Sequence, residues 1–206
     1  MVPAHRSARP REKIQLDLRS RARVVAIAGL LSSLVCVAIL HLLRTDLPPV
    51  AHRLSEYANG PYGWVMALAF AALGCGLIAL GVSLWSERPR EPLAWTIPAT
   101  AFLAGVGAIV SGMFRTGVSD TSEIVHSRAS AVATLALVVL CLVYSTRALR
   151  RSAARPDYVG TTLALIAATL VAISPLLHDT RWTGLSQRLL WIALIAWLLR
   201  TAWHRA

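Results

Sequence analysis

Five of the ten acids and three of the six histidines of this sequence lie in three polar segments that separate apolar stretches. Segments 44–60 and 115–128 each combine carboxylic acids with a histidine, and segment 176–188 adds two more arginines. A carboxyl group beside an imidazole is a frequent apparatus of general acid–base chemistry. The candidate catalytic residues in these segments are Glu56, Asp120, Glu123 and His126.

Glu123 and His126 are three residues apart, so on a helix they share a face. Partial burial raises the pKa of a carboxylic acid and leaves it protonated and able to donate. We therefore predict that Glu56 or Glu123 is the acid and that His126 is its partner.

Two other interpretations of the second segment stay open. Ser119 or Asp120 could cap a helix, with Glu123 near the first turn where the helix dipole favours an acid. The spacing Glu-x-x-His is also used by helices that bind two metal ions, but such a centre needs two copies, and the sequence has one. A single metal ion would have to use His126, Glu123, His178 and Asp179. We predict neither a metal nor a cofactor.

The remaining candidates are polar or aromatic residues that would bind a substrate: Tyr57, Tyr62, Trp64, Arg115, His178, Asp179, Gln187 and Arg188. The aromatic rings can cover an apolar chain or stabilise a cation, and they equally suit the aromatic belt of a membrane protein. Arg188, if buried, needs an acid, and the acids available to it are Glu56, Asp120 and Asp179. Alternatively, Arg188 and Arg115 hold a lipid phosphate.

Six apolar stretches must position these residues. The sequence is 56% hydrophobic with a mean hydropathy of +0.58, and each stretch approaches the roughly 20 residues that cross about 30 Å of hydrocarbon. The predicted spans are 23–43, 62–85, 93–114, 127–149, 158–177 and 185–203. The sixth is the shortest in apolar content and ends near Arg200 and His204. Short charged connections at 86–92 and 150–157 predict an all-α, up-and-down bundle of six transmembrane helices.

The distribution of charge predicts the topology. With the N-terminus inside the cell, fifteen arginines and lysines lie on inner segments and six on outer ones. We therefore predict a multi-pass protein of the cell membrane with both termini cytoplasmic and all three polar segments outside. This topology and anionic inner-leaflet lipid account for the net charge of +11, so we predict no nucleic-acid partner.

The predicted organisation is a basic, disordered cytoplasmic leader at 1–22 followed by a six-helix transmembrane domain at 23–206. Glycines at 74, 76 and 81 and at 105, 107 and 112 predict close packing of the second helix on the third. Cys36, Cys75 and Cys141 fall inside predicted spans, where a thiol is a packing residue. The sequence contains no Walker lysine loop, Gly-x-Ser-x-Gly elbow or His-Glu-x-x-His helix, which excludes the commonest enzyme classes.

Three stretches carry a resemblance to a known family: SEYANGPYGWVM, GMFRTGVSDTSEIVHSRAS and GLSQRLLW. Together they resemble a bacterial and archaeal six-helix membrane family, domain of unknown function 998. In layout that family is similar to eukaryotic membrane proteins of the autophagy-modulator and GPI-lipid-remodelling type. The resemblance implies membrane residence and six spans. One departure is that Arg115 and Thr116 stand where an acid is expected after Gly-x-Phe, and Asp120 follows later.

We predict a membrane-embedded enzyme that acts by acid–base chemistry on an amphipathic lipid or isoprenoid at the outer half of the bilayer. A proton-initiated terpene cyclisation is one concrete version. The alternatives are a structural or regulatory subunit with a membrane-protein partner, and a small transporter. The transporter alternative requires ionisable residues at mid-membrane, and the predicted spans hold almost none there.

Overall fold

The computed structural model describes residues 10–86, 91–151, 156–178 and 180–203. Six α-helices and two short 3-10 helices make up its regular structure, and the described residues contain no strand. The α-helices are α1 (Pro10–Leu43), α2 (Gly63–Trp85), α3 (Thr96–Met113), α4 (Asp120–Arg151), α5 (Tyr158–Leu177) and α6 (Thr183–Trp203). The 3-10 helices are η1 (Leu54–Ala58), after α1, and η2 (Pro92–Trp95), before α3.

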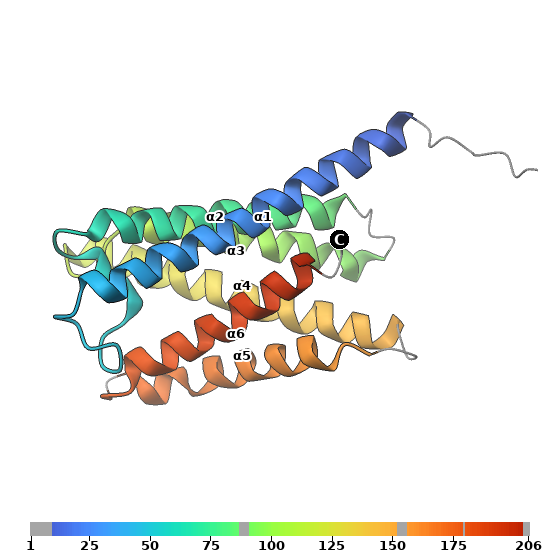
Figure 1. Ribbon diagram of the computed structural model, residues 1–206. Coiled ribbons are helices and arrows are strands. Elements are labelled where there is room, and N and C mark those ends of the chain that lie inside the picture. Colours follow the sequence, from blue (N-terminus) through green and yellow to red (C-terminus); the bar gives the residue numbers. More distant parts are fainter. Residues whose placement is uncertain (1–9, 87–90, 152–155, 179, 204–206) are drawn as a thin grey trace, which may run out of the picture.

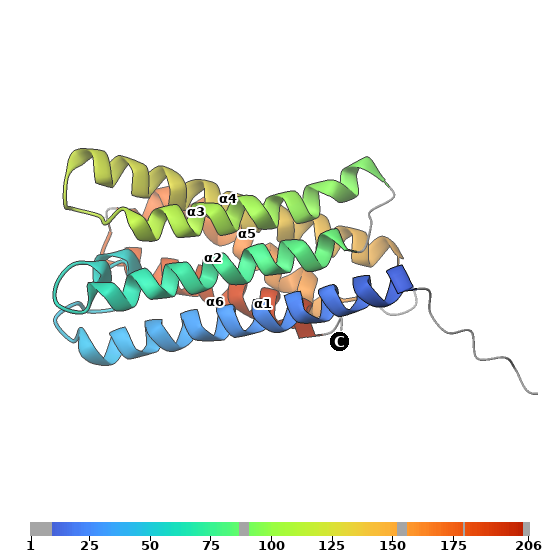
Figure 2. The same ribbon diagram turned by 90° about the horizontal axis from the view of Figure 1, so that it is seen from above.

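The helices run up and down, and each packs against its neighbour in the sequence. Helices α1 to α4 form a row in chain order, and the hairpin of α5 and α6 lies across one face of that row (Figures 1 and 2). We call the end that holds connections 44–62, 114–119 and 178–182 the loop end, and the opposite end the terminal end. The end of α6 meets α1 near the terminal end, where the Arg23 guanidinium donates to the Ala202 carbonyl at 3.2 Å, and the first turns of α1 extend beyond the bundle (Figure 1).

Five helices are long and apolar enough to cross a membrane: α1, α2, α3, α4 and α5. Helix α6 is continuous, but its apolar stretch 189–199 lies between Arg188 and Arg200. Eleven residues rise only about 16 Å, roughly half of the hydrocarbon thickness. Arg188 therefore has to find its partners inside the protein. The six-helix architecture is confirmed, with five helices that meet the requirements of a span.

The predicted disordered leader is wrong over residues 10–22, because α1 begins at Pro10. Proline suits the first turn of a helix, since it lacks only an N–H that has no intrahelical acceptor there. Asp17 and Arg21 form an i,i+4 ion pair at 3.0 Å on the exposed surface. The first nine residues lie outside the described part of the chain.

Glycines bring the helices of the row into backbone contact. A Cβ at Gly74 would lie 2.7 Å from the Gly105 carbonyl oxygen, so the predicted close packing of α2 on α3 is confirmed at this pair. Two other glycines face different partners: Gly76 meets Gly29 of α1, and Gly107 meets Ala133 of α4. Close approach gives the van der Waals contact that associates helices in lipid. The row is consequently held along its whole width.

The hairpin closes on α4 at the terminal end. The Trp197 indole N–H donates to Ser145 Oγ at 3.0 Å, and that hydroxyl lies 3.5 Å from the Gly160 carbonyl oxygen. Asp157 caps α5 through the Gly160 N–H and also accepts from the Arg200 guanidinium at 2.8 Å. These contacts join α4, α5 and α6 at one end only.

The contact between α1 and α2 gives a first prediction. A Cβ at Gly29 would lie 2.6 Å from the Ala72 carbonyl oxygen and 2.8 Å from Gly76 Cα, whereas one at Gly76 would meet nothing closer than 3.1 Å. Gly29→Ala should therefore lower the free energy of unfolding by about 1–3 kcal/mol, and Gly76→Ala by less. Unfolding of both variants in mixed micelles measures this. Equal losses would show that α1 and α2 are not in backbone contact at Gly29.

Candidate functional site

A cavity of about 480 Å³ lies between the row and the hairpin. Its volume is within the usual range for small-molecule sites, about 300–1,000 Å³. Its walls come from α2, α3, α4, α5, α6 and the segment around η1, and none of its lining residues belongs to α1. Along α6 the lining runs from Thr183 to Leu198, a rise of about 22 Å. The cavity is thus a long, narrow slot that starts at the loop end.

The lining changes character with depth. Near the loop end it carries polar side chains: Arg53, Ser55, Thr116, Glu123, His126, Ser127, Ser130, His178, Thr183, Ser186 and Gln187. Deeper in the bundle it is apolar, with Leu73, Leu77, Leu137, Leu194 and Leu198. Such a gradient matches a ligand with a polar head and an apolar tail, because each part meets groups of its own kind.

Some lining residues are also exposed on the outside of the bundle, and they mark where the cavity reaches the surface. On α4 they are Ser127, Ala131 and Leu135, spaced four residues apart along one face. On α5 they are Ser174, Pro175 and His178. The cavity therefore opens sideways between α4 and α5 in the loop half, on the flank that lipid covers.

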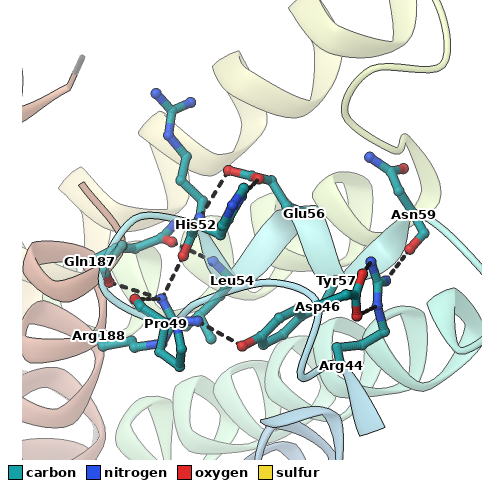
Figure 3. Close-up of polar contacts among 12 residues, drawn as sticks. Arg44, Asp46, Pro49, His52, Leu54, Glu56, Tyr57, Asn59, Gln187 and Arg188 are labelled. Atoms are coloured by element: carbon teal, nitrogen blue, oxygen red, sulfur yellow. Dashed lines mark hydrogen bonds and ion pairs between the residues drawn. The ribbon is translucent and has the colours of Figure 1, made fainter. Parts of the chain in front are cut away.

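Arg188 of α6 binds the connection between α1 and α2, which lies over the cavity (Figure 3). Arg188 Nη1 donates to the carbonyl oxygens of Pro49 and His52, both at 2.6 Å, and to that of Gly184 at 3.0 Å. Its Nε donates to His41 Nε2 at 2.9 Å and its Nη2 to the Tyr57 hydroxyl at 3.0 Å. None of these five acceptors carries a negative charge. The predicted ion pair of Arg188 with an acid is therefore wrong for the described acids.

The partners of Arg188 are themselves held in place. His41 Nδ1–H donates to the Val37 carbonyl at 2.8 Å, which leaves Nε2 as the acceptor that Arg188 needs. The Tyr57 ring is fully buried and meets the His41 ring edge-on at 5.3 Å. At Gly184, a Cβ would lie 2.5 Å from the Pro49 carbonyl oxygen. Only glycine lets the connection lie this close to α6.

Glu56 lies in η1 and acts as a hydrogen-bond acceptor. Its Oε1 accepts from the Arg53 N–H at 2.9 Å, and its Oε2 accepts from His52 Nδ1 at 2.6 Å. Burial alone raises the pKa of Glu56, but these two hydrogen bonds outweigh it and hold the pKa below its usual value. The carboxylate form is favoured, so the raised pKa that a proton donor needs is absent at Glu56. The η1 segment packs on the bundle, with Leu54 and Tyr57 buried.

Two side chains join η1 to the hairpin across the mouth of the cavity. Arg53 Nη2 donates to His178 Nε2 at 2.7 Å, which links η1 to the end of α5. Gln187 Oε1 accepts from the Leu54 N–H at 2.7 Å, which links η1 to α6. Arg53, His178 and Gln187 all line the cavity. The structure thus brings the predicted binding residues His178 and Gln187 together.

In the second polar segment, 115–128, one residue caps α4 and others line the cavity. Ser119 Oγ accepts from the Ser122 N–H at 3.2 Å and caps α4, while Asp120 is the first helical residue and is exposed. Asp120 does not line the cavity. Glu123 does, and its carboxylate accepts from the Gly117 N–H at 2.8 Å and from the Ser127 hydroxyl at 3.4 Å.

His126 is the buried imidazole of the cavity, 5% exposed. Its Nδ1–H lies 2.8 Å from the carbonyl oxygens of both Ser111 and Phe114, at the end of α3. Carbonyl oxygens only accept, so the proton is on Nδ1 and Nε2 is a free acceptor. The nearest hydroxyl to Nε2 is that of Ser130, at 3.4 Å. The Nε2 atom of His126 therefore faces Ser130 as a hydrogen-bond acceptor.

Several predicted binding residues lie elsewhere. Tyr62 and Trp64 are 37% and 64% exposed and do not line the cavity, and Arg115 is exposed as well. Tyr57 does not line the cavity, and its buried hydroxyl accepts from Arg188. Asp179 lies outside the described residues. The lining instead includes aromatic and hydroxyl residues that the sequence analysis did not select: Phe70, Ser111, Ser130, Thr134, Ser174 and Trp191. Hydroxyls within otherwise apolar spans were the signal that could have identified them. Over the described residues, no group of three or more His, Cys, Asp or Glu could hold a metal ion.

The helices and the cavity define a multi-pass helical membrane protein whose cavity is polar toward the loop end and apolar in depth. The chain belongs to the family described as protein of unknown function DUF998, whose model matches residues 27–204, and the resemblance noted from the three motifs is confirmed. A Corynebacterium glutamicum protein named an uncharacterized transporter is 34% identical over 101 residues. The matched part is 44% of this chain and 18% of that relative, so the chain spans less than a fifth of the relative's length. No solved structure matches the chain.

The Arg188 contacts give a second prediction. Arg188→Lys keeps the charge but cannot donate to five acceptors in these directions, so carbonyl oxygens of the connection lose their donor. Hydrogen bonds to a charged group are worth about 1.5–3 kcal/mol each, and we expect a loss of about 3 kcal/mol or more in the free energy of unfolding. Arg181→Lys, an exposed arginine in the neighbouring connection, is the control and should leave stability unchanged. An Arg188→Lys protein as stable as the wild type would remove this role.

The lowered pKa of Glu56 gives a third prediction. A carboxyl group whose pKa is lower in the folded state stabilises the fold above its usual pKa, about 4.3, and the effect is lost as pH falls through the lowered value. Stability of the wild type should therefore fall more steeply below about pH 5 than that of Glu56→Gln. Thermal unfolding between pH 3 and pH 7, on the order of one scan per unit, compares the two. Parallel curves would contradict the assignment of Glu56 as a bound carboxylate.

Proposed function

We propose that the protein binds one amphipathic lipid or isoprenoid in the cavity, with the head at the loop end and the chain along α6. The observation that carries this proposal is the graded lining: charged and hydroxyl groups at the mouth and leucines in depth. A water-soluble metabolite would leave the leucines without an apolar partner. An alkane would leave the polar groups near the mouth without one.

The side opening supports a ligand that arrives from the bilayer. The exposed lining residues of α4 and α5 flank the cavity where acyl chains would surround the bundle. A chain can enter there without passing through water. The arginine distribution favours an extracytoplasmic loop end, and with that orientation the ligand would come from the outer leaflet.

His126 is the residue we assign to proton transfer in this site, because its Nε2 is a free acceptor in the cavity wall. Glu56 and Glu123 both accept hydrogen bonds, which suits anions better than proton donors. A proton-initiated cyclisation needs a strong acid facing the apolar part of the cavity. The contacts of the described acids do not favour that version, and the proposal is base chemistry on the head of an amphiphile.

A small transporter is the second candidate, and the printed name of the Corynebacterium glutamicum relative favours it. A carrier has to open its site alternately to the two sides of the membrane. In this chain the contacts of Trp197 and Asp157 close the terminal end, so a carrier would have to break them. Counterflow of labelled lipid in proteoliposomes would occur for a carrier and not for an enzyme with one opening.

The proposed function gives a fourth prediction. Protein purified in mild detergent should carry a co-purified amphiphile, which native mass spectrometry after lipid extraction identifies. Ala108 is buried and lines the cavity, so Ala108→Leu fills part of the slot and should reduce the bound fraction by about tenfold, the effect of about 1.4 kcal/mol. Ala99→Leu, on the exposed face of the same helix, is the matched control and should keep it. Wild-type protein without any bound amphiphile, or equal binding by Ala108→Leu, would contradict the proposal.

A further inference from the structure

Three polar side chains meet in the wall of the cavity, between α3 and α4. The Ser130 hydroxyl donates to Ser111 Oγ at 3.0 Å, its oxygen lies 3.4 Å from His126 Nε2, and all three residues line the cavity. The Ser111 hydroxyl donates in turn to the Gly107 carbonyl at 2.8 Å. An imidazole acceptor within reach of a hydroxyl is the arrangement that activates a serine nucleophile.

We propose that Ser130 is a nucleophile and His126 its base, so that the site transfers or hydrolyses the acyl group of an amphipathic ester. This inference rests on the proposed function and names its reaction class. It adds an activity that binding alone does not require.

The base is oriented as nucleophilic catalysis demands. In a serine hydrolase a third group holds the Nδ1–H of the histidine and thereby fixes the tautomer with Nε2 free. Here the carbonyl oxygens of Ser111 and Phe114 take that part. They carry no full negative charge, so they stabilise the imidazolium less than a carboxylate does. We accordingly expect slow turnover.

The position of Ser130 suits an ester bond. Ser130 lies ten residues after the start of α4, about 15 Å along the helix axis. On the same helix, Glu123 and Ser127 of the lining lie toward the loop end, and Ala133 and Leu137 lie deeper. The nucleophile thus stands at the boundary of the polar and apolar lining, where the ester between a polar head and an acyl chain would lie.

The reaction balances without any other reagent than water. Ser130 Oγ attacks the ester carbonyl carbon and its proton passes to His126 Nε2. The tetrahedral intermediate releases the alcohol, which takes that proton, and the acyl group stays on Ser130. Water then attacks the acyl carbonyl and gives its proton to Nε2. Ser130 leaves with this proton, and a carboxylic acid is released.

One buried hydroxyl of the cavity is unpaired. Thr116 lines the cavity, and its buried Oγ1 has no hydrogen-bond partner among the described residues. An unpaired buried hydroxyl costs stability unless something else uses it.

The competing explanation is that Ser130 only joins α4 to α3 through Ser111, as polar residues often do between membrane helices. A long-chain fluorophosphonate distinguishes the two, because it reacts with an activated serine and not with a structural one. The full chain in nanodiscs is treated with this probe, and the modified residue is identified by peptide mass spectrometry.

The expected result is an adduct on Ser130 that is absent in Ser130→Ala. His126→Gln should slow labelling by about 100-fold or more, the usual contribution of a general base. Ser145→Ala is the matched control, since Ser145 is a buried serine of the same helix outside the cavity, and it should label at the wild-type rate. If His126→Gln fails to fold, the adduct and its loss in Ser130→Ala decide the question.

Co-purified lipid is measured on the same samples, so that the two proposals fail separately. Wild-type protein that carries an amphiphile but forms no adduct on Ser130 would overturn the acyl-transfer inference and leave the binding proposal standing. Labelling that His126→Gln does not slow would remove His126 as the base. Protein that carries no amphiphile would overturn the binding proposal and, with it, this inference.

Discussion

The structure depends on the need of one half-buried guanidinium, that of Arg188, for five acceptors, none of which is an acid. The apolar stretch of α6 is too short to carry both Arg188 and Arg200 out of the bilayer, so Arg188 is satisfied internally. Its acceptors come from α1, from the connection that follows, from η1 and from α6. Leaving a buried charge unpaired costs roughly several kcal/mol, so Arg188 holds these elements together. The position of the connection between α1 and α2 over the cavity is a consequence of that requirement.

The cavity itself follows from an asymmetry in packing. Water expels apolar side chains, but lipid does not, so membrane helices associate through close contact and internal polar bonds. The row has glycines at its contacts, among them Gly29, Gly74 and Gly105, and it packs backbone to backbone. Large residues of the hairpin such as Trp191 and Leu194 face the row, and polar bonds hold the hairpin mainly at its two ends. Space remains between the two layers.

Much of this was predictable, and the failures have a common cause. The spans follow from hydrophobicity, and the close approach at Gly74 follows from residue size. The partners of Arg188 could not be predicted, because three of the five, the carbonyls of Pro49 and His52 and the hydroxyl of Tyr57, belong to the connection and η1, where no spacing rule gives their directions. Glu56 does not line the cavity, and its pKa is lowered where a proton donor needs a raised one, since the Arg53 N–H that it binds is a feature of the 3-10 turn. His126 was identified as chemically important, and only the structure shows which of its nitrogens is free.

The connection that covers the cavity and the entrance between α4 and α5 are separate parts of the molecule. Arg188 holds the His52 carbonyl, and the next residue, Arg53, reaches across the mouth to His178 of α5. Opening this end to water would break the contacts of a buried charge. The flank between α4 and α5 has no such bond in the loop half among the described residues, and Pro175 interrupts the backbone hydrogen bonds of α5 there. A ligand that enters from the bilayer would therefore leave the connection over the cavity in place. His126 and Ser130 would then stay in a site where little water competes for the Nε2 atom of His126.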